Sequence, residues 1–418
     1  MTVELSTLEG GLRVASDAMP ELETAAIGVW VDAGARNESP AQGGVSHLLE
    51  HMAFKGTERR SARAIAEEVE AVGGQINAYT SREQTAYFIR VLKEDVELAL
   101  DILADILQHS TFEAAELERE REVVIQEISQ VQDTPDDLIF DLLQETAFPD
   151  QPMGRSILGS ADRVRAFERQ ALMSYMERHY QAPRMVLAAS GRIQHEALVG
   201  RVGELFRLPA GTAQARQPAH YQGGERREVR QLEQAHITLA FPGLAFDDED
   251  FYAIQVLSTV LGGGMSSRLF QELREKRGLC YSVFSFASAY LDAGLFGVYA
   301  GTGENEVGEL VPVLCDEIAR VAEDVDEAET ARARAQHKAG IMMGLEAPMA
   351  RCEHLGRQLL IYGRAIPTAE LIAEIDAVDT AALKRVAGRV LGGGPPVLAA
   401  IGPISRLESY DRVRARFS

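Results

Sequence analysis

The chain has 418 residues, 46% of them hydrophobic, which is enough apolar material for two or three globular units with their own cores. Its 42 lysines and arginines against 63 aspartates and glutamates give a net charge of −21 at pH 7, which disfavours binding to nucleic acid or to anionic membranes. The three cysteines form no CxxC pair and no apolar run approaches the ~18 residues of a membrane span, so a disulfide scaffold, a cysteine zinc site and a membrane protein are not indicated.

The first residues of the chain, 1–6, lack the features of a secretion signal or an organelle transit peptide. Together with the low cysteine content, this favours a reducing compartment. We therefore expect a cytoplasmic protein.

The first predicted strand, residues 25–34, is followed by a short apolar segment that contains two histidines. Residues 47–51 read His-Leu-Leu-Glu-His, an inverted H-x-x-E-H zinc motif, with glycines on both sides of the segment. The apolar residues between these glycines predict a short helix. On such a helix His47 and His51 lie four residues apart on one face, and Glu50 lies on the same side.

These three side chains fit the chemistry of a catalytic zinc site. Zinc binds neutral imidazole nitrogens, and a catalytic site keeps one coordination position for water. The metal lowers the pKa of that water towards about 7, and a carboxylate that is not a ligand takes its proton during attack on an amide carbonyl. We therefore expect His47 and His51 to bind zinc and Glu50 to act as the general base. A helix with exposed histidines is the alternative.

A third zinc ligand must come from elsewhere, because catalytic zinc sites usually have three protein ligands. Residues 113–130 predict a helix dense in glutamate, with Leu117, Val124 and Ile128 in its buried stripe. Any of its glutamates could bind the metal on chemical grounds, and most of them are expected to be solvated surface charges.

The predicted elements of the first half recur in the second half in the same order. The plainest match is Val-Leu-Ala-Ala-Ser-Gly at 186–191 against Val-Leu-Ala-Ala-Ile-Gly at 397–402. The other matched segments are 25–34 with 235–243, 88–91 with 296–299, 95–108 with 306–321, and 166–180 with 377–391. This duplication predicts an α+β fold of two tandem repeated halves, each a mainly antiparallel sheet covered by helices on one side.

A polar stretch rich in Gly, Pro, Gln and Arg separates the two halves. Such composition suits a solvated linker. We therefore place an N-terminal, zinc-binding catalytic domain at 1–208, a linker at 209–228 and a C-terminal repeat domain at 229–418, with a single continuous domain as the alternative.

The second half has no H-x-x-E-H motif where it pairs with residues 47–51, and it reads Gln-Val-Leu-Ser-Thr-Val-Leu-Gly at 255–262. It carries a glycine-rich segment at 262–270 instead. That segment lacks the Gly-Lys-Ser/Thr ending of a phosphate-binding loop, which disfavours nucleotide binding. We therefore expect no metal site in the second half.

The segment from His47 to Thr57, His-Leu-Leu-Glu-His-Met-Ala-Phe-Lys-Gly-Thr, resembles the signature of the pitrilysin-type inverzincin metallopeptidases. Within that family it is most similar to the mitochondrial processing peptidase β-subunit branch and its short bacterial relatives, and the resemblance spans essentially the whole chain. It implies that Glu127 is the third zinc ligand. It also implies that Glu120, two helical turns earlier, orients a metal-binding histidine, the alternative being an ordinary surface charge.

The resemblance implies further site residues in both halves. Residues 73–80, Gly-Gly-Gln-Ile-Asn-Ala-Tyr-Thr, are similar to the family's strand beside the zinc, which implies that Asn77 and Ala78 bind an extended peptide along the strand edge. An arginine and a tyrosine that reach the zinc site from the family's non-catalytic half correspond to Arg274 and Tyr281. A guanidinium can hold a substrate carbonyl, and a phenol can donate a hydrogen bond to an oxyanion. From the residues alone, Arg274 and Tyr281 could as well be ordinary side chains on the surface of a helix and of a strand.

We therefore predict a zinc-dependent endopeptidase with one Zn²⁺ per chain that hydrolyses unfolded or short peptides. The resemblance implies a homodimer, or a heterodimer with an inactive homologue, whose halves enclose a chamber. The acidic composition favours basic, presequence-like peptides as substrates. A catalytically silent binding or assembly subunit and a structural zinc protein are the alternatives, and the intact Glu50 argues against both.

Overall fold

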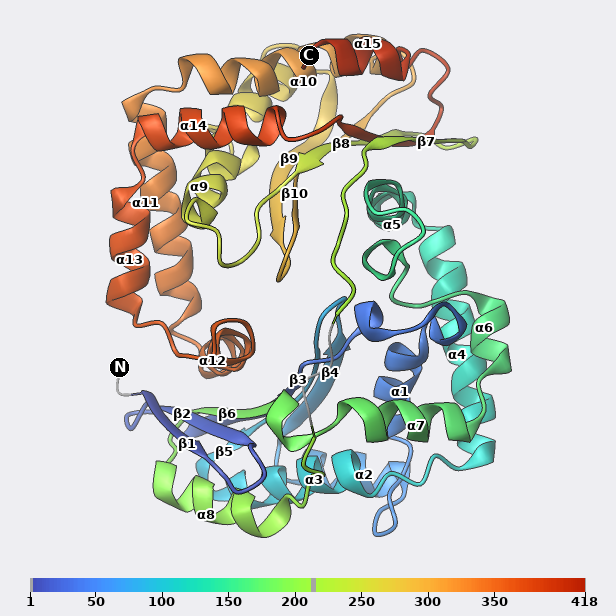
Figure 1. Cartoon of the computed structure of the whole chain (residues 1–418), viewed down its shortest axis with the longest axis vertical. Helices are drawn as coiled ribbons and strands as arrows, with labels where there is room; N and C mark the ends of the chain where they lie inside the picture. Colours follow the sequence, from blue (N-terminus) through green and yellow to red (C-terminus); the bar gives the residue numbers. More distant parts are fainter. Residues whose placement is uncertain (1–2, 212–215, 418) are drawn as a thin grey trace. The chain divides into compact units, whose positions relative to one another are not determined.

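The computed structural model describes residues 3–211 and 216–417 (Figure 1). The chain forms two compact units, and each takes segments from both halves of the sequence. The first unit comprises Met1–Ser129, Arg155–Gln217 and Met342–Pro367, and the second comprises Gln130–Gly154, Pro218–Ile341 and Thr368–Ser418. The domain limits drawn from the sequence repeat stay a prediction, and residues 212–215 of the predicted linker lie outside the described residues.

The first unit is built on a six-stranded, mainly antiparallel sheet. Its strand order is β1-β2-β6-β3-β5-β4, in which β2 and β6 pair in parallel and the other neighbours pair antiparallel. The strands are β1 (Val3–Thr7), β2 (Arg13–Ala18), β3 (Thr24–Val31), β4 (Gln75–Thr80), β5 (Thr85–Leu92) and β6 (Met185–Gly191). Strand β4 lies at one edge of this sheet.

Helices cover both faces of this sheet. A core that includes Ile27, Leu49 and Leu103 joins one face to α1 (Val45–Ala53), α2 (Ala62–Ala71), α3 (Val96–Gln108), α4 (Ala114–Gln132), α7 (Arg169–His179) and α8 (His195–Leu205). The other face packs against α12 (Pro348–Tyr362), where a Cβ on Gly356 would lie 2.4 Å from the ring of Trp30. The short helix α6 (Ala161–Ala166) precedes α7.

The expectation of helices on one side of each sheet was therefore wrong. Almost every residue of β3 and β6 is buried, whichever face it points to. Strands that are apolar on both faces require a layer of protein on each side. The second layer comes from α12, a helix that is distant in the sequence.

The second unit repeats the topology of the first with one strand fewer. Its strand order is β7-β11-β8-β10-β9, with β7 and β11 parallel and the other neighbours antiparallel. The strands are β7 (Gly224–Val229), β8 (Ala235–Pro242), β9 (Cys280–Ala289), β10 (Gly294–Thr302) and β11 (Val397–Gly402). This order matches β2-β6-β3-β5-β4, so the predicted α+β fold of two repeated, mainly antiparallel halves is confirmed.

The sheet of the second unit is also covered on both faces. One face packs on α9 (Phe251–Gly262), α10 (Val307–Asp324) and α14 (Thr380–Leu391), with α13 (Thr368–Ala377) and α15 (Tyr410–Ala415) alongside. The other face packs on α5 (Pro135–Ala147) through a separate apolar cluster. The long helix α11 spans Glu327–Gly344.

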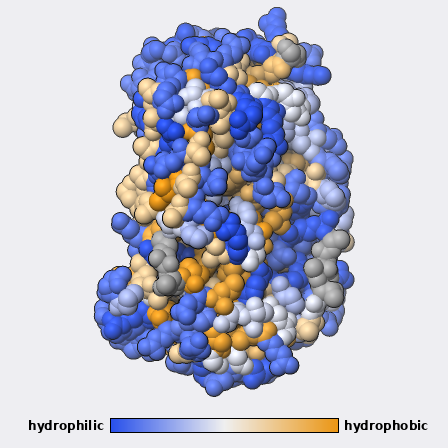
Figure 2. All heavy atoms as spheres, turned by 60° about the vertical axis from the view of Figure 1, so that its left-hand side comes forward, coloured by the Kyte–Doolittle hydropathy of each residue, from blue (hydrophilic) through white to orange (hydrophobic). Residues whose placement is uncertain are grey.

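The surface carries both hydrophilic and hydrophobic residues. The face drawn in Figure 2 is largely hydrophilic, with smaller hydrophobic areas between the polar residues. Across 3–211 and 216–417, no helix has the length and apolar character needed to cross a membrane. The cysteines at 280, 315 and 352 are unpaired and buried.

Candidate metal centre

The helix that carries both histidines of the H-x-x-E-H motif, α1, has a fixed N-terminus. Gly44 adopts a φ of 95°, and a Cβ there would lie 2.5 Å from the carbonyl oxygen of Leu158, so this position requires glycine. The buried carboxylate of Glu38 accepts hydrogen bonds from the backbone amides of Gly44 and Ser46, each at 2.8 Å. These bonds satisfy amides that the start of a helix leaves without an intrahelical partner.

His47 and His51 share the polar side of α1, and their ring centroids are 4.7 Å apart. Burial, followed by the neighbouring His51, lowers the pKa of His47 to about 4, so this imidazole is neutral at pH 7. Burial also disfavours the charged form of His51, but its hydrogen bond to Glu120 and the charges of Glu127 and Glu50 raise its pKa above the ordinary value. A neutral imidazole is the form that binds a metal ion.

The third candidate ligand comes from α4. Oε2 of Glu127 lies 3.5 Å from Nε2 of His51 and 3.7 Å from Nε2 of His47. Ligand atoms of the three residues all lie within 4.8 Å of one another, and this is the only such group of His, Cys, Asp and Glu in the part of the chain that the structure describes. A tetrahedral zinc ion with bonds of about 2.1 Å separates its ligand atoms by about 3.4 Å, so the three residues fit zinc.

Glu120 lies two helical turns before Glu127 on α4 and is 5% exposed. Its Oε2 is 3.1 Å from Nδ1 of His51, and its Oε1 is 2.8 Å from Nζ of Lys55. Burial raises the pKa of this carboxyl, but the hydrogen bonds from His51 and Lys55 outweigh burial, and the pKa lies below its ordinary value. A carboxylate in this position can fix the tautomer and direction of a metal-binding imidazole.

Glu50 lies next to His51 on α1, and its carboxylate is hydrogen-bonded to β4. Thr80, the last residue of β4, donates from Oγ1 to Oε2 of Glu50 at 2.6 Å. Burial raises the pKa of Glu50 above its ordinary value, while the bond from Thr80 and the charge of His51 act in the opposite direction. A carboxyl group with a raised pKa is suited to accept and return a proton near neutral pH.

The predicted peptide-binding residues Asn77 and Ala78 lie on β4, which ends at the residue that contacts Glu50. The side chain of Asn77 is exposed, and its Oδ1 accepts a hydrogen bond from the amide of Ala78 at 2.8 Å. Since β4 is an edge strand, an extended peptide could add to it as a further strand. The peptide-binding roles of the two residues stay a prediction.

Arg274 and Tyr281 belong to the second unit. Arg274 lies in a π-helical turn, Phe270–Glu275, and Tyr281 is the second residue of β9. The guanidinium carbon of Arg274 lies 4.6 Å from the ring centroid of Phe270 and 5.1 Å from that of Tyr281, a cation–π arrangement. Tyr281 is 77% exposed. Two residues seven positions apart thus lie together and remain accessible, and their role in catalysis stays a prediction.

Two residues of this centre, Lys55 and Thr80, were not predicted from the sequence. Lys55 lies four residues after His51, a spacing that could have suggested a neighbouring side chain. Thr80 contacts Glu50 only because β4 packs beside α1, and no local pattern in the sequence reveals that contact.

Protein families and individual relatives match nearly the whole chain. Residues 13–161 match the family described as "Insulinase (Peptidase family M16)", and residues 166–337 match "Peptidase M16 inactive domain". The chain is 42% identical to "Probable mitochondrial-processing peptidase subunit beta, mitochondrial" of Arabidopsis thaliana, over 99% of this chain and 80% of that protein. It is 40% identical to an uncharacterized zinc protease of Streptomyces coelicolor, over 96% and 90% of the two chains.

Solved structures also share the fold. A chain in "Complex III2 from Candida albicans, Inz-5 bound" superposes with a TM-score of 0.88 at 22% identity, and the match covers 99% of both chains. A protease from Helicobacter pylori gives a TM-score of 0.88 at 22% identity, over 96% of this chain and 99% of that one. At this identity the likeness establishes the fold alone.

Proposed function

Because the chain belongs to peptidase family M16, we propose that it is a zinc-dependent endopeptidase. One observation carries the proposal. The metal-binding atoms of His47, His51 and Glu127, from two separate helices, lie within 4.8 Å of one another. Glu50, which lies between the two histidines in the sequence, keeps its carboxylate out of that group and bonded to Thr80. A site with three ligands and a separate carboxylate is the arrangement of a catalytic zinc, not of a structural one.

In the proposed mechanism His47, His51 and Glu127 hold the metal. When bound, zinc polarises a peptide carbonyl and lowers the pKa of a water molecule. The carboxylate of Glu50 accepts a proton from the attacking water and then returns it to the leaving amine. Thr80 keeps one oxygen of Glu50 engaged, which leaves the other oxygen to act as the base. Glu120 holds the imidazole of His51 from the side opposite to its Nε2.

We propose that the peptide lies along the edge of β4, where Asn77 and Ala78 provide its hydrogen-bonding groups. Arg274 would hold a substrate carbonyl, and Tyr281 would donate a hydrogen bond to the developing oxyanion. A strand edge accepts only an extended chain, so unfolded or short peptides are the expected substrates. The net charge of −21 favours basic peptides among them.

We propose one zinc per chain, which the single cluster of candidate ligands in the described residues supports. We further propose that the protein works as a homodimer, with a heterodimer as the alternative. Two relatives of the same family are named as subunits of a processing peptidase, and these names support the proposal that the protein works in an assembly.

Metal analysis combined with peptide hydrolysis tests the proposal. Purified protein should contain about one zinc per chain and cleave peptides from a mixed library. Treatment with a chelator should abolish cleavage, and added zinc should restore it. Arg-rich and Glu-rich peptides compared at low and high salt would test the substrate preference, since equal rates would remove it.

Matched variants assign the roles. Glu50→Gln should keep zinc and lose turnover, whereas His51→Ala should lose both. Glu122→Gln changes an exposed glutamate of α4 in the same way and should alter neither. A protein that binds zinc but cleaves no peptide would instead be a binding or assembly subunit.

A further inference from the structure

Lys55 is joined to the candidate metal centre through one carboxylate. Oε1 of Glu120 lies 2.8 Å from Nζ of Lys55, and Oε2 of the same group lies 3.1 Å from Nδ1 of His51. The side chain of Glu120 is 7% exposed and that of Lys55 is 30% exposed. The two oxygens of a nearly buried carboxylate are thus divided between a cation and a candidate ligand.

Lys55 follows the end of helix α1 at Ala53, and its backbone amide donates to the carbonyl of Met52 at 3.2 Å. Further backbone contacts fix the rest of the segment 54–61. The amide of Thr111 donates to the carbonyl of Gly56 at 3.1 Å, and the amide of Glu58 donates to the carbonyl of His109 at 3.1 Å. Gly56 and Ser61 also form a β-bridge, which closes the segment on itself.

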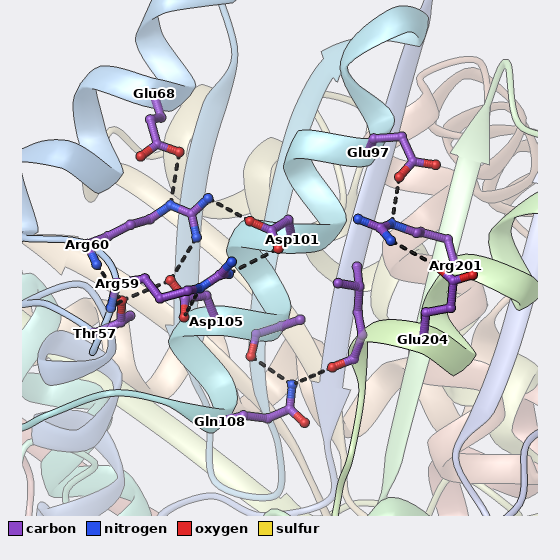
Figure 3. Close-up of polar contacts among 12 residues, drawn as sticks. Thr57, Arg59, Arg60, Glu68, Glu97, Asp101, Asp105, Gln108, Arg201 and Glu204 are labelled. Atoms are coloured by element: carbon purple, nitrogen blue, oxygen red, sulfur yellow. Dashed lines mark hydrogen bonds and ion pairs between the residues drawn. The ribbon is translucent and has the colours of Figure 1, made fainter.

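Charged and polar side chains tie the same segment to α3 (Figure 3). The carboxylate of Asp105 is fully buried and accepts hydrogen bonds from Thr57 and Arg60, both at 2.8 Å, and from Arg59 at 3.1 Å. Asp101, one helical turn earlier, accepts from the same two arginines at 2.6 and 3.0 Å. These five hydrogen bonds, made by Thr57, Arg59 and Arg60, tie the segment after Lys55 to α3.

We propose that Lys55 is a positioning residue of the metal centre, which holds Glu120 so that Glu120 can hold His51. The inference rests on the proposed zinc site. With Oε1 kept on Lys55, the carboxylate cannot rotate away from Nδ1 of His51, and Nε2 of that ring is directed towards Glu127 and His47. The fixed segment 54–61 holds the backbone from which the flexible side chain of Lys55 reaches Glu120.

The burial of Glu120 determines how unfavourable the loss of its contact with Lys55 is. Without Lys55, one oxygen of a nearly buried carboxylate would lack its partner, which is unfavourable. The carboxylate would then turn towards solvent or another donor, and the direction of the His51 ring would no longer be fixed. Losing partners that orient metal ligands typically weakens metal binding about 10–100-fold.

Zinc affinity of the full-length protein, measured by competition with a chromophoric chelator, tests this inference. Lys55→Met should raise the zinc dissociation constant about tenfold, and Lys55→Arg, which keeps the charge, should restore most of the affinity. Lys338→Met is the matched control, because Lys338 pairs with Asp376 in the second unit and its side chain is 32% exposed, close to the 30% of Lys55. The control should leave zinc affinity unchanged.

A double-mutant cycle asks whether Lys55 acts through Glu120. In the Glu120→Gln protein, Lys55→Met should have little further effect on zinc affinity, because nothing is left to position. Near-UV circular dichroism of the zinc-free proteins verifies their folding. Lys55→Gln, which removes the charge but keeps a donor, should also weaken zinc binding and provides the comparison should the Met variant lose its fold.

Two results would overturn the inference while leaving the proposed function intact. In the first, the wild type binds zinc and cleaves peptides, but Lys55→Met binds zinc as tightly as Lys338→Met. In the second, the effects of Lys55→Met and Glu120→Gln add fully, which would mean that Lys55 acts independently of Glu120. A wild type that binds no zinc would instead refute the proposed function, and this inference with it.

Discussion

Asp105 provides a sharp test of how segment 54–61 is held. Its carboxylate is 0% exposed and accepts three hydrogen bonds, from Thr57, Arg59 and Arg60. Asp105→Ala removes all three, but Arg60 keeps Asp101 and Glu68 as partners, so its charge is not left alone.

The expected loss follows from these contacts. All three hydrogen bonds are made to a charged carboxylate, and such a bond contributes about 1.5–3 kcal/mol. The side chain of Arg59 is 52% exposed, and such a pair contributes less than about 1 kcal/mol. Since Arg60 keeps other partners, we expect Asp105→Ala to lower the free energy of unfolding by about 3 kcal/mol.

The chain contains a suitable probe. Its single tryptophan, Trp30, is buried in β3 of the same unit, so its fluorescence during urea unfolding reports on that unit. Asp101→Ala, at a side chain that is 20% exposed, should lower the free energy of unfolding by about 1 kcal/mol, and Asp376→Ala, at a side chain that is 50% exposed, by less than about 0.5 kcal/mol. Equal destabilisation by Asp105→Ala and Asp376→Ala would contradict the role given to Asp105. We also expect Asp105→Ala to weaken zinc binding, because Lys55 follows the same segment.

Further predictions concern the helix start, the general base and the metal. Because the hydroxyl of Thr80 orients Glu50, Thr80→Val should lower kcat about tenfold and leave the zinc content unchanged. Thr80→Ser keeps the hydroxyl and should retain activity. An unchanged kcat in the valine variant would contradict this role. Burial raises the pKa of Glu38 from 4.5 to about 7, so its contribution to stability is fully present below pH 4.5 and is lost as the pH rises through about 7. In zinc-free protein, Glu38→Gln should therefore flatten the fall in unfolding free energy between about pH 5 and 8, and equal pH slopes in the two proteins would argue against it. Removal of the metal should lower the melting temperature of the wild type more than that of His51→Ala, as measured by scanning calorimetry, since only the former loses a bound ligand.

The repeat made the fold predictable from the sequence. Strands β3 and β8, β5 and β10, and β6 and β11 were matched by their apolar patterns, and they occupy equivalent places in the two sheets. The second helical layer was not predictable in this way. Residues 348–362 belong to none of the matched segments, and only the packing of Gly356 against Trp30 shows which sheet α12 covers.

The candidate site also contains residues that local spacing predicts and residues that it does not. His47, Glu50 and His51 lie within one helical turn of each other, so spacing alone indicated a shared face. Glu127 was one of several glutamates in an acidic helix, and the residues alone did not select it; the family resemblance did. The geometry now brings it to 3.5 Å from His51. Thr80 and Lys55 depend on contacts between different elements, to which hydrophobic patterns are insensitive.

A crystal structure with bound zinc would show whether the three proposed ligands hold the metal. In crystals of the protein grown with zinc, an anomalous difference map at the zinc absorption edge should contain one peak per chain, bounded by Nε2 of His47, Nε2 of His51 and the carboxylate of Glu127, with the carboxylate of Glu50 outside bonding distance. A map with no peak there, or with a peak whose ligands exclude Glu127, would contradict the proposed catalytic centre.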